Sequence, residues 1–134
     1  MSQPKTPLLT VDCVVFDAAG RLLLIKRKKP PFEGQYALPG GFVDIGETVE
    51  AAALRELKEE TGVEGKIEAL IGVYSDPGRD PRGHTVSAAF LVRTDATVAQ
   101  GGDDAAEANF VSEWRGLTLA FDHAKIVADA LSRR

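Results

Sequence analysis

Residues 41–63 read GFVDIGETVEAAALRELKEETGV and carry more structural information than any other part of this chain. Nine residues in this stretch stand at set intervals and are glycine, glutamate, arginine or apolar. They are Gly41, Glu47, Arg55-Glu56-Leu57, Glu59-Glu60 and Gly62-Val63. Thr48 is a residue type that caps the amino end of helices, and Gly62 is the type that commonly follows the carboxyl end. The stretch therefore predicts a helix that starts after Thr48 and runs to about Glu60.

Three carboxylates share one face of this predicted helix. At about 100° per residue, Glu59 lies at about −60° and Glu60 at about +40° from Glu56. Such neighbours repel by roughly 3 kcal/mol at an effective dielectric of about 20, and by under about 1 kcal/mol in water. In a cleft the cluster requires a cation, whereas on an open surface it is only a solvated acidic face. The adjacent arc is apolar and can pack on a sheet through Ala53, Leu54 and Leu57.

The complete spacing resembles the Nudix box, so the chain is similar to the Nudix hydrolase family. The resemblance implies an α/β sandwich, with a mixed β-sheet between helices, over nearly the whole chain. It also implies a Mg²⁺ site, with Mn²⁺ as a substitute, because all-oxygen ligands select a hard cation. The implied metal ligands are the backbone carbonyl of Gly40 and the carboxylates of Glu56, Glu59 and Glu60.

The chemistry that the resemblance implies is substitution at phosphorus. Bound metal ions neutralise phosphate charge and lower the pKa of a bound water, and a carboxylate then removes the proton of that water. In the family the box arginine orients the neighbouring glutamates, a task that would fall to Arg55. Glu56 would be among the catalytic groups, and Glu47 would support the cluster.

Two glutamates are candidates for the general base, because family members differ in which one serves. Some relatives use a box glutamate, which here would be Glu59, and others use a glutamate on a later loop. Glu107 follows the acidic pair Asp103-Asp104, where many relatives keep an extra metal-binding glutamate. A plain solvent-facing residue is the alternative for Glu107.

Segments outside the box favour one substrate class. Pro77 lies 15 residues past Gly62, and a proline at about that distance marks the ADP-ribose pyrophosphatase group of the family. Residues 75–87 and 120–131 also resemble that group. The resemblance thus implies hydrolysis of ADP-ribose to AMP and ribose 5-phosphate. Oxidised nucleoside triphosphates, dinucleoside polyphosphates or other nucleotide sugars are the alternatives.

A nucleotide-sensing module without catalysis is a further alternative. Some regulators join a similar sensor domain to a DNA-binding winged helix. The intact box favours catalysis, and we expect no room for a DNA-binding module in a chain that stops at Arg134.

Four residues are candidates for substrate binding: Arg27, Arg79, Arg82 and Gly41. Guanidinium groups match phosphate oxygens, and a glycine lets the backbone approach a ligand. The alternatives are that Asp80 and Arg82 only fasten their loop, and that Arg27 belongs to a solvated charge run. Phe32 and Tyr36 could stack on adenine or pack in the core. For His84 and His123 we expect structural hydrogen bonds.

Composition indicates one globular domain over residues 1–134. The chain has 44% hydrophobic and 27% charged residues and a net charge of −4, which argues against nonspecific nucleic-acid binding. The single cysteine, Cys13, excludes an intrachain disulfide and is expected to pack as a small hydrophobe. With no signal core and no membrane-length apolar run, we expect a cytoplasmic protein without a membrane partner. Many ADP-ribose pyrophosphatases are dimers, so a homodimer is one arrangement that the resemblance implies.

Strands alternate with helices in the rest of the pattern. Strands are expected at 8–17, 21–28, 35–38, 67–75, 84–94 and 107–111. Pro39-Gly40-Gly41 is expected to break the chain after the third of these. A last helix is expected at 121–131, with Ala124, Val127, Ala128 and Leu131 at helical spacing. Strands mixed with two helices agree with an α/β sandwich.

Overall fold

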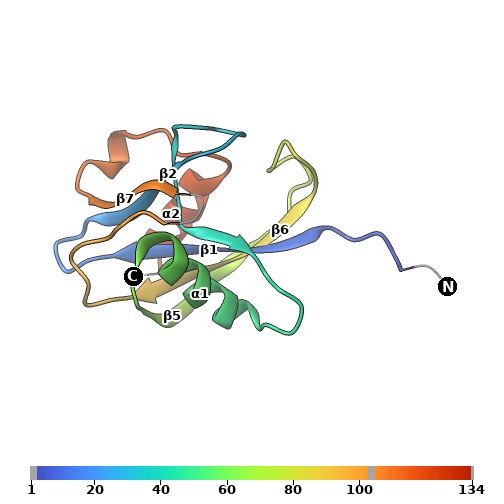
Figure 1. Cartoon of the computed structure of the whole chain (residues 1–134), viewed down its shortest axis with the longest axis horizontal. Coiled ribbons are helices and arrows are strands. Elements are labelled where there is room, and N and C mark those ends of the chain that lie inside the picture. The colour runs from blue at the N-terminus through green and yellow to red at the C-terminus, as the bar shows by residue number, and fades with distance from the viewer. Residues whose placement is uncertain (1–2, 103–104, 134) are drawn as a thin grey trace.

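The computed structural model describes residues 3–102 and 105–133. Within these residues lie seven strands, two α-helices and one short 3₁₀ turn (Figure 1). In chain order they are β1 (Leu8–Phe16), β2 (Leu22–Arg27), β3 (Tyr36–Ala37), β4 (Gly40–Phe42), α1 (Val49–Thr61), β5 (Lys66–Tyr74), β6 (Thr85–Arg93), β7 (Ala105–Val111), η1 (Trp114–Gly116) and α2 (His123–Leu131). No helix in this described part is long and apolar enough to cross a membrane.

The strands form one mixed sheet around β1. β6 runs parallel to β1 over its whole length, and the other pairs are antiparallel. The order across the sheet is β3-β2-β1-β6-β5, with β7 beside β2 and β4 beside β1. β4 pairs with residues 10–12 of β1, whereas β2 meets β1 only at Phe16 and Leu22. The first half of β1 therefore faces β4 rather than β2.

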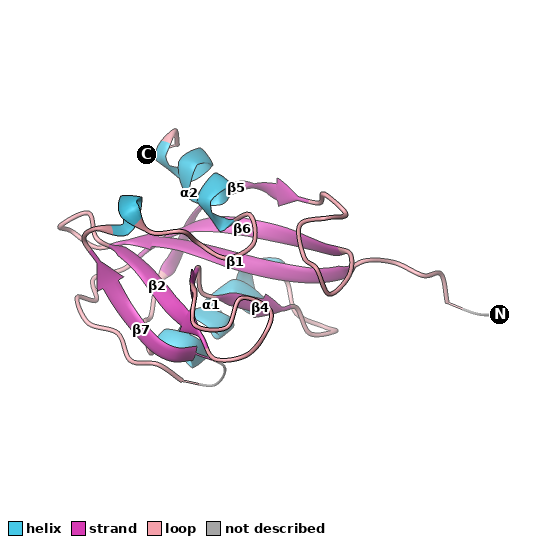
Figure 2. Ribbon diagram, turned by 90° about the horizontal axis from the view of Figure 1, so that it is seen from above, coloured by secondary structure: helices cyan, strands magenta, loops and turns pink. Residues whose placement is uncertain are grey.

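Each face of the sheet is covered by one helix. Successive side chains of a strand point to opposite faces. Accordingly Val11, Cys13 and Val15 pack in the core beneath α1, whereas Val14 and Phe16 pack in the core beneath α2. Figure 2 shows the sheet lying between the two helices. The predicted mixed sheet between helices is confirmed.

The start and the end of α1 lie where the capping residues of the sequence predicted them. The Thr48 hydroxyl accepts a hydrogen bond from the Ala51 N–H at 3.1 Å, as an N-cap does. Gly62 ends the helix with φ of 70°, a left-handed conformation that costs glycine little. Ala53 and Leu57 are fully buried, so the predicted apolar arc does pack on the sheet.

The break expected after the third predicted strand is present, because β3 ends at Ala37 and a bend at Pro39 separates it from β4. Gly40 and Gly41 begin β4 and pair with Asp12 and Val11 of β1. An ideal Cβ on Gly40 would collide with the Val11 carbonyl oxygen. The sequence did not predict that the two glycines start a new strand, and close pairing of that strand with β1 requires glycine at position 40.

The buried face of the last helix is displaced by about one residue from the apolar face that the sequence predicted. The helix begins at His123, and its buried residues are His123, Ile126, Val127 and Ala130. Ala124 and Ala128 are exposed. The side chain of His123 takes an inward position because its ring is hydrogen-bonded to the chain before β4.

Candidate functional site

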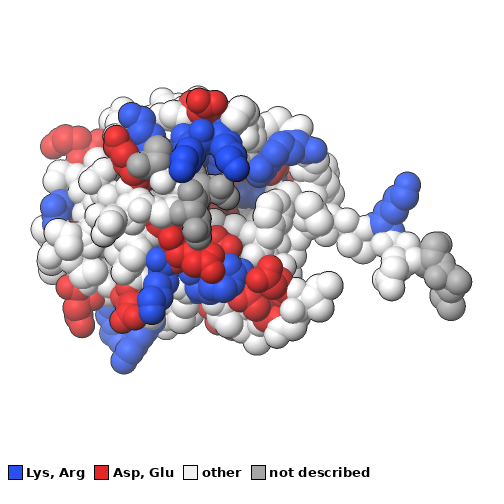
Figure 3. Space-filling view, in the orientation of Figure 1, with Lys and Arg blue, Asp and Glu red and all other residues white. Residues whose placement is uncertain are grey.

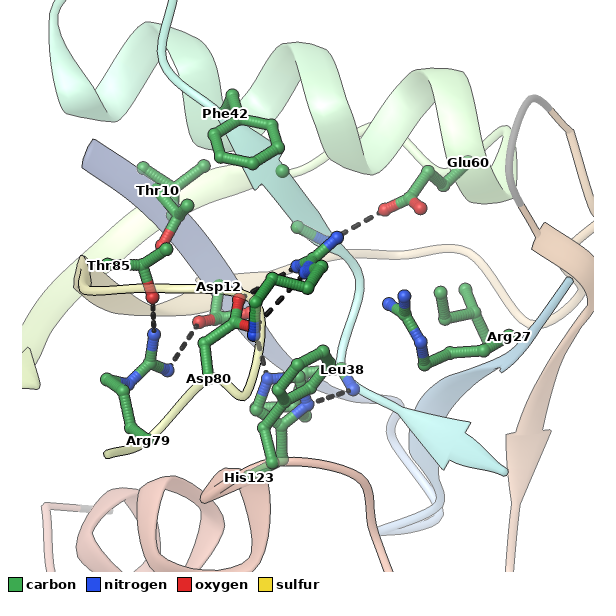
Figure 4. A pocket seen from close by; sticks show the side chains of 16 residues that line it. Thr10, Asp12, Arg27, Leu38, Phe42, Glu60, Arg79, Asp80, Thr85 and His123 are labelled. Atoms are coloured by element: carbon green, nitrogen blue, oxygen red, sulfur yellow. Dashed lines mark hydrogen bonds and ion pairs between the residues drawn. The ribbon is translucent and has the colours of Figure 1, made fainter. Parts of the chain in front are cut away.

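A pocket lies among β1, β2, β4, the end of α1, the loop after β5 and the start of α2. Six predicted site residues line it: Arg27, Gly40, Gly41, Glu60, Arg79 and Arg82. Among the other lining residues are Asp12, Phe42, Thr85, Phe121 and His123, none of which was predicted as a site residue. Figure 4 shows Glu60 reaching in from α1 and His123 from α2. Residues far apart in the chain thus meet around one cavity.

The acidic helix meets the glycine pair at this pocket. Glu60 is only 6% exposed, and its Oε1 accepts a hydrogen bond from the Gly40 N–H at 2.8 Å. An ideal Cβ on Gly41 would lie 2.5 Å from the carboxyl carbon of Glu56 and 2.8 Å from its Oε1. Only glycine at position 41 leaves room for that carboxylate. Two predicted metal ligands therefore lie directly against the backbone of β4.

Arg55 lies between the remaining carboxylates. Its Nε and Nη2 donate to the two carboxylate oxygens of Glu47, at 2.6 and 2.8 Å. Its Nη1 donates to Glu56 at 2.7 Å and to Glu59 at 3.2 Å. Figure 3 shows acidic side chains gathered over α1, with basic side chains beside them. One guanidinium thus holds three glutamates together and offsets their repulsion.

The donor set fits a hard divalent cation. It consists of carboxylate oxygens, which hard cations prefer, and the missing Cβ at Gly41 lets Glu56 lie against the main chain. Among the described residues, no group of three or more His, Cys, Asp or Glu side chains stands ready around one point. Instead, Arg55 holds Glu56 and Glu59, while the Gly40 N–H holds Glu60.

The titration of Glu47 reports on the Arg55 cluster. Hydrogen bonds from the Arg55 side chain lower the pKa of Glu47 from 4.5 to about 2, and the Asp44 N–H adds to this effect. A lowered pKa in the folded state contributes stability above pH 4.5, which is lost as the pH falls toward about 2.

We expect carboxyl NMR in metal-free buffer to find a titration midpoint of Glu47 at about 2. Arg55→Ala should raise the titration midpoint of Glu47, whereas the control variant Arg115→Ala should leave it unchanged. A midpoint near 4.5 in the unaltered protein would contradict the contact between Arg55 and Glu47.

Arg79 is directed into the protein. Its side chain is 5% exposed, and Nε and Nη2 donate to the two carboxylate oxygens of Asp122 at 2.9 and 2.8 Å. Its Nη1 donates to the Thr85 hydroxyl at 2.9 Å. Burial acts to lower the pKa of Arg79, but the bond to Asp122 and nearby carboxylates raise it overall. This guanidinium shapes the pocket wall by joining the loop after β5 to α2.

Arg82 and Arg27 flank the ring of Phe121. The Cζ atoms of the two arginines lie 5.7 and 4.9 Å from the ring centroid. Arg82 also donates to both carboxylate oxygens of Asp80, at 3.1 and 2.8 Å, while its side chain stays 49% exposed. The Arg27 Nε donates to the Pro31 carbonyl at 2.7 Å. Phe121 thus carries two cations at the pocket, which is a suitable surface for an anion.

Glu107 lies in a different setting from the box glutamates. It is an exposed residue of β7, paired in register with Lys26 of β2, and it does not line the pocket. Side chains alternate along a strand, so Lys26 and Glu107 face away from Ile25, which does line the pocket. The acidic pair Asp103-Asp104 lies outside the described residues.

The predicted aromatic candidates do not line the pocket. Phe32 packs edge-to-face on Phe121 at 4.8 Å between centroids, and Tyr36 packs against the core beneath α2. Phe42 and Phe121 take the pocket positions instead. No local signal in the sequence distinguishes these aromatic residues, because the distinction depends on strand pairing.

His84, His123 and Cys13 were expected to have structural rather than catalytic roles. His84 bonds the Ser75 carbonyl at 2.9 Å, and His123 bonds the Leu38 N–H at 3.0 Å. Both histidines therefore make the structural hydrogen bonds expected of them. Cys13 is fully buried, and burial together with the nearby carboxylate of Asp12 raises the pKa of its thiol. An inert packing role for Cys13 agrees with this environment.

Comparisons with known proteins agree on one family. The model of the NUDIX domain matches residues 6–130. An ADP-ribose pyrophosphatase of Methanocaldococcus jannaschii is 50% identical over 123 residues, which are 92% of this chain and 72% of that protein.

Two solved structures are similar to the whole fold. The NUDIX domain of Shewanella oneidensis NrtR, complexed with ADP ribose, has a TM-score of 0.87 and 30% identity, covering 96% of this chain and 89% of that one. A bifunctional NMN adenylyltransferase/ADP ribose pyrophosphatase of Francisella tularensis, complexed with AMP and a Mn ion, has a TM-score of 0.85 and 28% identity. It covers 98% of this chain, which spans only 43% of that protein.

Proposed function

The chain belongs to the Nudix family, and we propose that residues 1–134 act as one domain that hydrolyses the pyrophosphate bond of ADP-ribose with Mg²⁺. The products would be AMP and ribose 5-phosphate. The observation that carries the proposal is the contact of Glu56 and Glu60 with the glycine pair of β4, beside a pocket bordered by Arg27 and Arg82. Acidic groups for a metal and basic groups for phosphate thus border one cavity.

ADP-ribose is favoured over other nucleotides by similarity along the chain. The pyrophosphatase of M. jannaschii shares half of the aligned residues, and the alignment covers 92% of this chain. The NrtR domain that binds ADP ribose has the same fold at 30% identity. We extend their ligand to this chain as a proposal. A homodimer and a cytoplasmic location stay predictions from the sequence.

The residues of the chain would divide the work as follows. Glu56, Glu59 and Glu60, with the Gly40 carbonyl, would hold Mg²⁺, for which Mn²⁺ could substitute. When bound, the metal supplies charge neutralisation and a water of lowered pKa. Arg55 keeps Glu56 and Glu59 in place through its Nη1, while its Nε and Nη2 are bonded to Glu47.

The substrate would lie along the opposite wall. Arg82 and Arg27 would bind the phosphate oxygens beside Phe121, and Gly41 would let the substrate approach the backbone of β4. Arg79 would act indirectly, by fixing the loop that carries Arg82, because its own donors are bonded to Asp122 and Thr85.

Glu59 is our proposed general base. It is exposed, and it lies beside Glu56 because both accept from the same Arg55 nitrogen. A base must reach a water next to the metal-bound phosphate. Glu107 remains the second candidate, although it lies on the strand opposite Lys26 and outside the pocket lining.

A substrate panel tests this function. Purified protein with Mg²⁺ is given ADP-ribose, an oxidised nucleoside triphosphate, a dinucleoside polyphosphate and a nucleotide sugar, and the products are separated by ion-exchange chromatography. We expect the highest kcat/KM for ADP-ribose, with AMP as a product. No turnover of ADP-ribose beside turnover of another compound would assign the same chemistry to that compound instead. Tight ADP-ribose binding without turnover of any compound would indicate a sensor and refute catalysis.

A further inference from the structure

The chain just before β4 is held from three directions. Leu38 and Pro39 lie between β3 and β4, outside both strands. The Cys13 N–H of β1 donates to the Pro39 carbonyl at 2.8 Å, and the Gly40 N–H donates to Glu60 of α1 at 2.8 Å. The buried Leu38 N–H has no strand partner and would lose hydrogen-bond energy if unpaired. It must therefore be satisfied from elsewhere in the fold.

His123 supplies that partner from α2. Its Nδ1 accepts the Leu38 N–H at 3.0 Å. Since Nδ1 accepts, the ring proton is assigned to Nε2, which lies 3.3 Å from Asp12 Oδ1. The ring is therefore hydrogen-bonded to the backbone through Nδ1, and its other nitrogen stands close to a carboxylate.

Asp12 in turn is fixed from behind. Its Oδ2 accepts from the Ser87 hydroxyl at 2.5 Å and lies 3.7 Å from the Arg79 Nη2. Its Oδ1 faces Gly40, because an ideal Cβ there would lie 2.8 Å from that oxygen. Asp12 thus touches both His123 and the glycine whose carbonyl is a proposed metal ligand.

The start of α2 is shaped to present His123 inward. Phe121 has a φ of 54°, a left-handed conformation that is strained for a bulky residue. Asp122 stands at the N-cap position, but its carboxylate bonds Arg79 and makes no cap hydrogen bond. Two features that are locally unfavourable for a helix start thus coincide where His123 meets Leu38.

We infer that His123, supported by Asp12, is a positioning residue for the metal site. It fixes the Leu38–Gly40 segment on the side opposite Glu60, so that the Gly40 carbonyl and the carboxylates of α1 keep their relative places. His123 touches neither the reacting atoms nor the metal in this role. The inference rests on the proposed function for its metal, and on the contacts above for its geometry.

Two substitutions separate the two nitrogens of the ring. In His123→Asn the amide oxygen can stand near the place of Nδ1 and accept the Leu38 N–H. In His123→Gln the polar group stands near the place of Nε2, and the Leu38 N–H loses its partner. The measurements are Mg²⁺ affinity by calorimetry without substrate and exchange of the Leu38 amide by NMR, with the Leu117 amide as the control.

We expect His123→Gln to weaken Mg²⁺ binding about tenfold and to speed Leu38 exchange, because groups that orient metal ligands have effects of this size. His123→Asn should keep both values near those of the unaltered protein, and neither variant should change Leu117. Equal weakening in both variants, or unchanged Mg²⁺ affinity in His123→Gln, would overturn the inference.

One measurement needs no variant. In the unaltered protein, Mg²⁺ should slow Leu38 exchange relative to Leu117, because a bound ion would hold the Gly40 carbonyl. An unchanged ratio at saturating Mg²⁺ would also overturn the inference. Failure of the proposed function would look different: the protein would bind Mg²⁺ but hydrolyse no compound of the substrate panel.

Discussion

Replacing Glu60 by glutamine is expected to lower kcat at least about 100-fold, because a metal ligand loses its charge. Glutamine has the same shape, and its side-chain oxygen can still accept the Gly40 N–H that Glu60 accepts at 2.8 Å. The fold should therefore survive, while Mg²⁺ binding weakens. Steady-state kinetics over a Mg²⁺ series and thermal unfolding of the same samples measure the two effects separately.

Glu50→Gln is the matched control for this experiment. Glu50 is an exposed glutamate in the first turn of the same helix, away from the pocket. The substitution Glu50→Gln removes one negative charge from α1 and leaves the contacts of the glycine pair unchanged. Equal losses of turnover in both variants would point to helix charge in general. Full activity of Glu60→Gln would contradict the assignment of Glu60 to the metal.

Gly41→Ala is expected to lower kcat by about 100-fold with little loss of stability, because the new methyl group would displace the Glu56 carboxylate. The colliding atoms belong to the end of a flexible side chain, which can swing away. We therefore expect the free energy of unfolding to stay within about 1 kcal/mol of the unaltered value. Chemical denaturation and kcat measure the two sides of this prediction.

Gly40→Ala and Gly116→Ala are the two control variants for this experiment. At Gly40 the added Cβ would collide with the Val11 carbonyl oxygen, which belongs to the backbone of the central strand. That variant should lose stability as well as activity. At Gly116 an ideal Cβ meets no atom within 4 Å, so activity and stability should both persist. Normal turnover in Gly41→Ala would show that the position of Glu56 does not matter for catalysis.

Helix α1 illustrates what could be predicted without coordinates. Its cap at Thr48, its end before Gly62 and its acidic face all follow from signals within one stretch of chain. Each signal depends only on residues three or four positions apart, which a helix brings together whatever surrounds it. The set of candidate metal ligands followed from the same stretch and its resemblance to the Nudix box.

The other wall of the pocket had no such local signal. Asp12 meets Ser87 across 75 positions, and His123 meets Leu38 across 85. Arg79 was expected at the substrate, yet its donors are directed at Asp122 and Thr85. Whether a buried polar residue serves a ligand or another residue depends on which partners the sheet brings near.

The sequence by itself determined the acidic helix, its limits and the family to which the chain belongs, because these depend on spacing along one segment. The tertiary structure alone decided that the glycine pair lies in a strand, that Phe42 and Phe121 rather than Phe32 and Tyr36 line the pocket, and that His123 bonds the chain before β4. The physical reason is that strand pairing and burial join distant residues, and the energies of those contacts exist only once the sheet has formed.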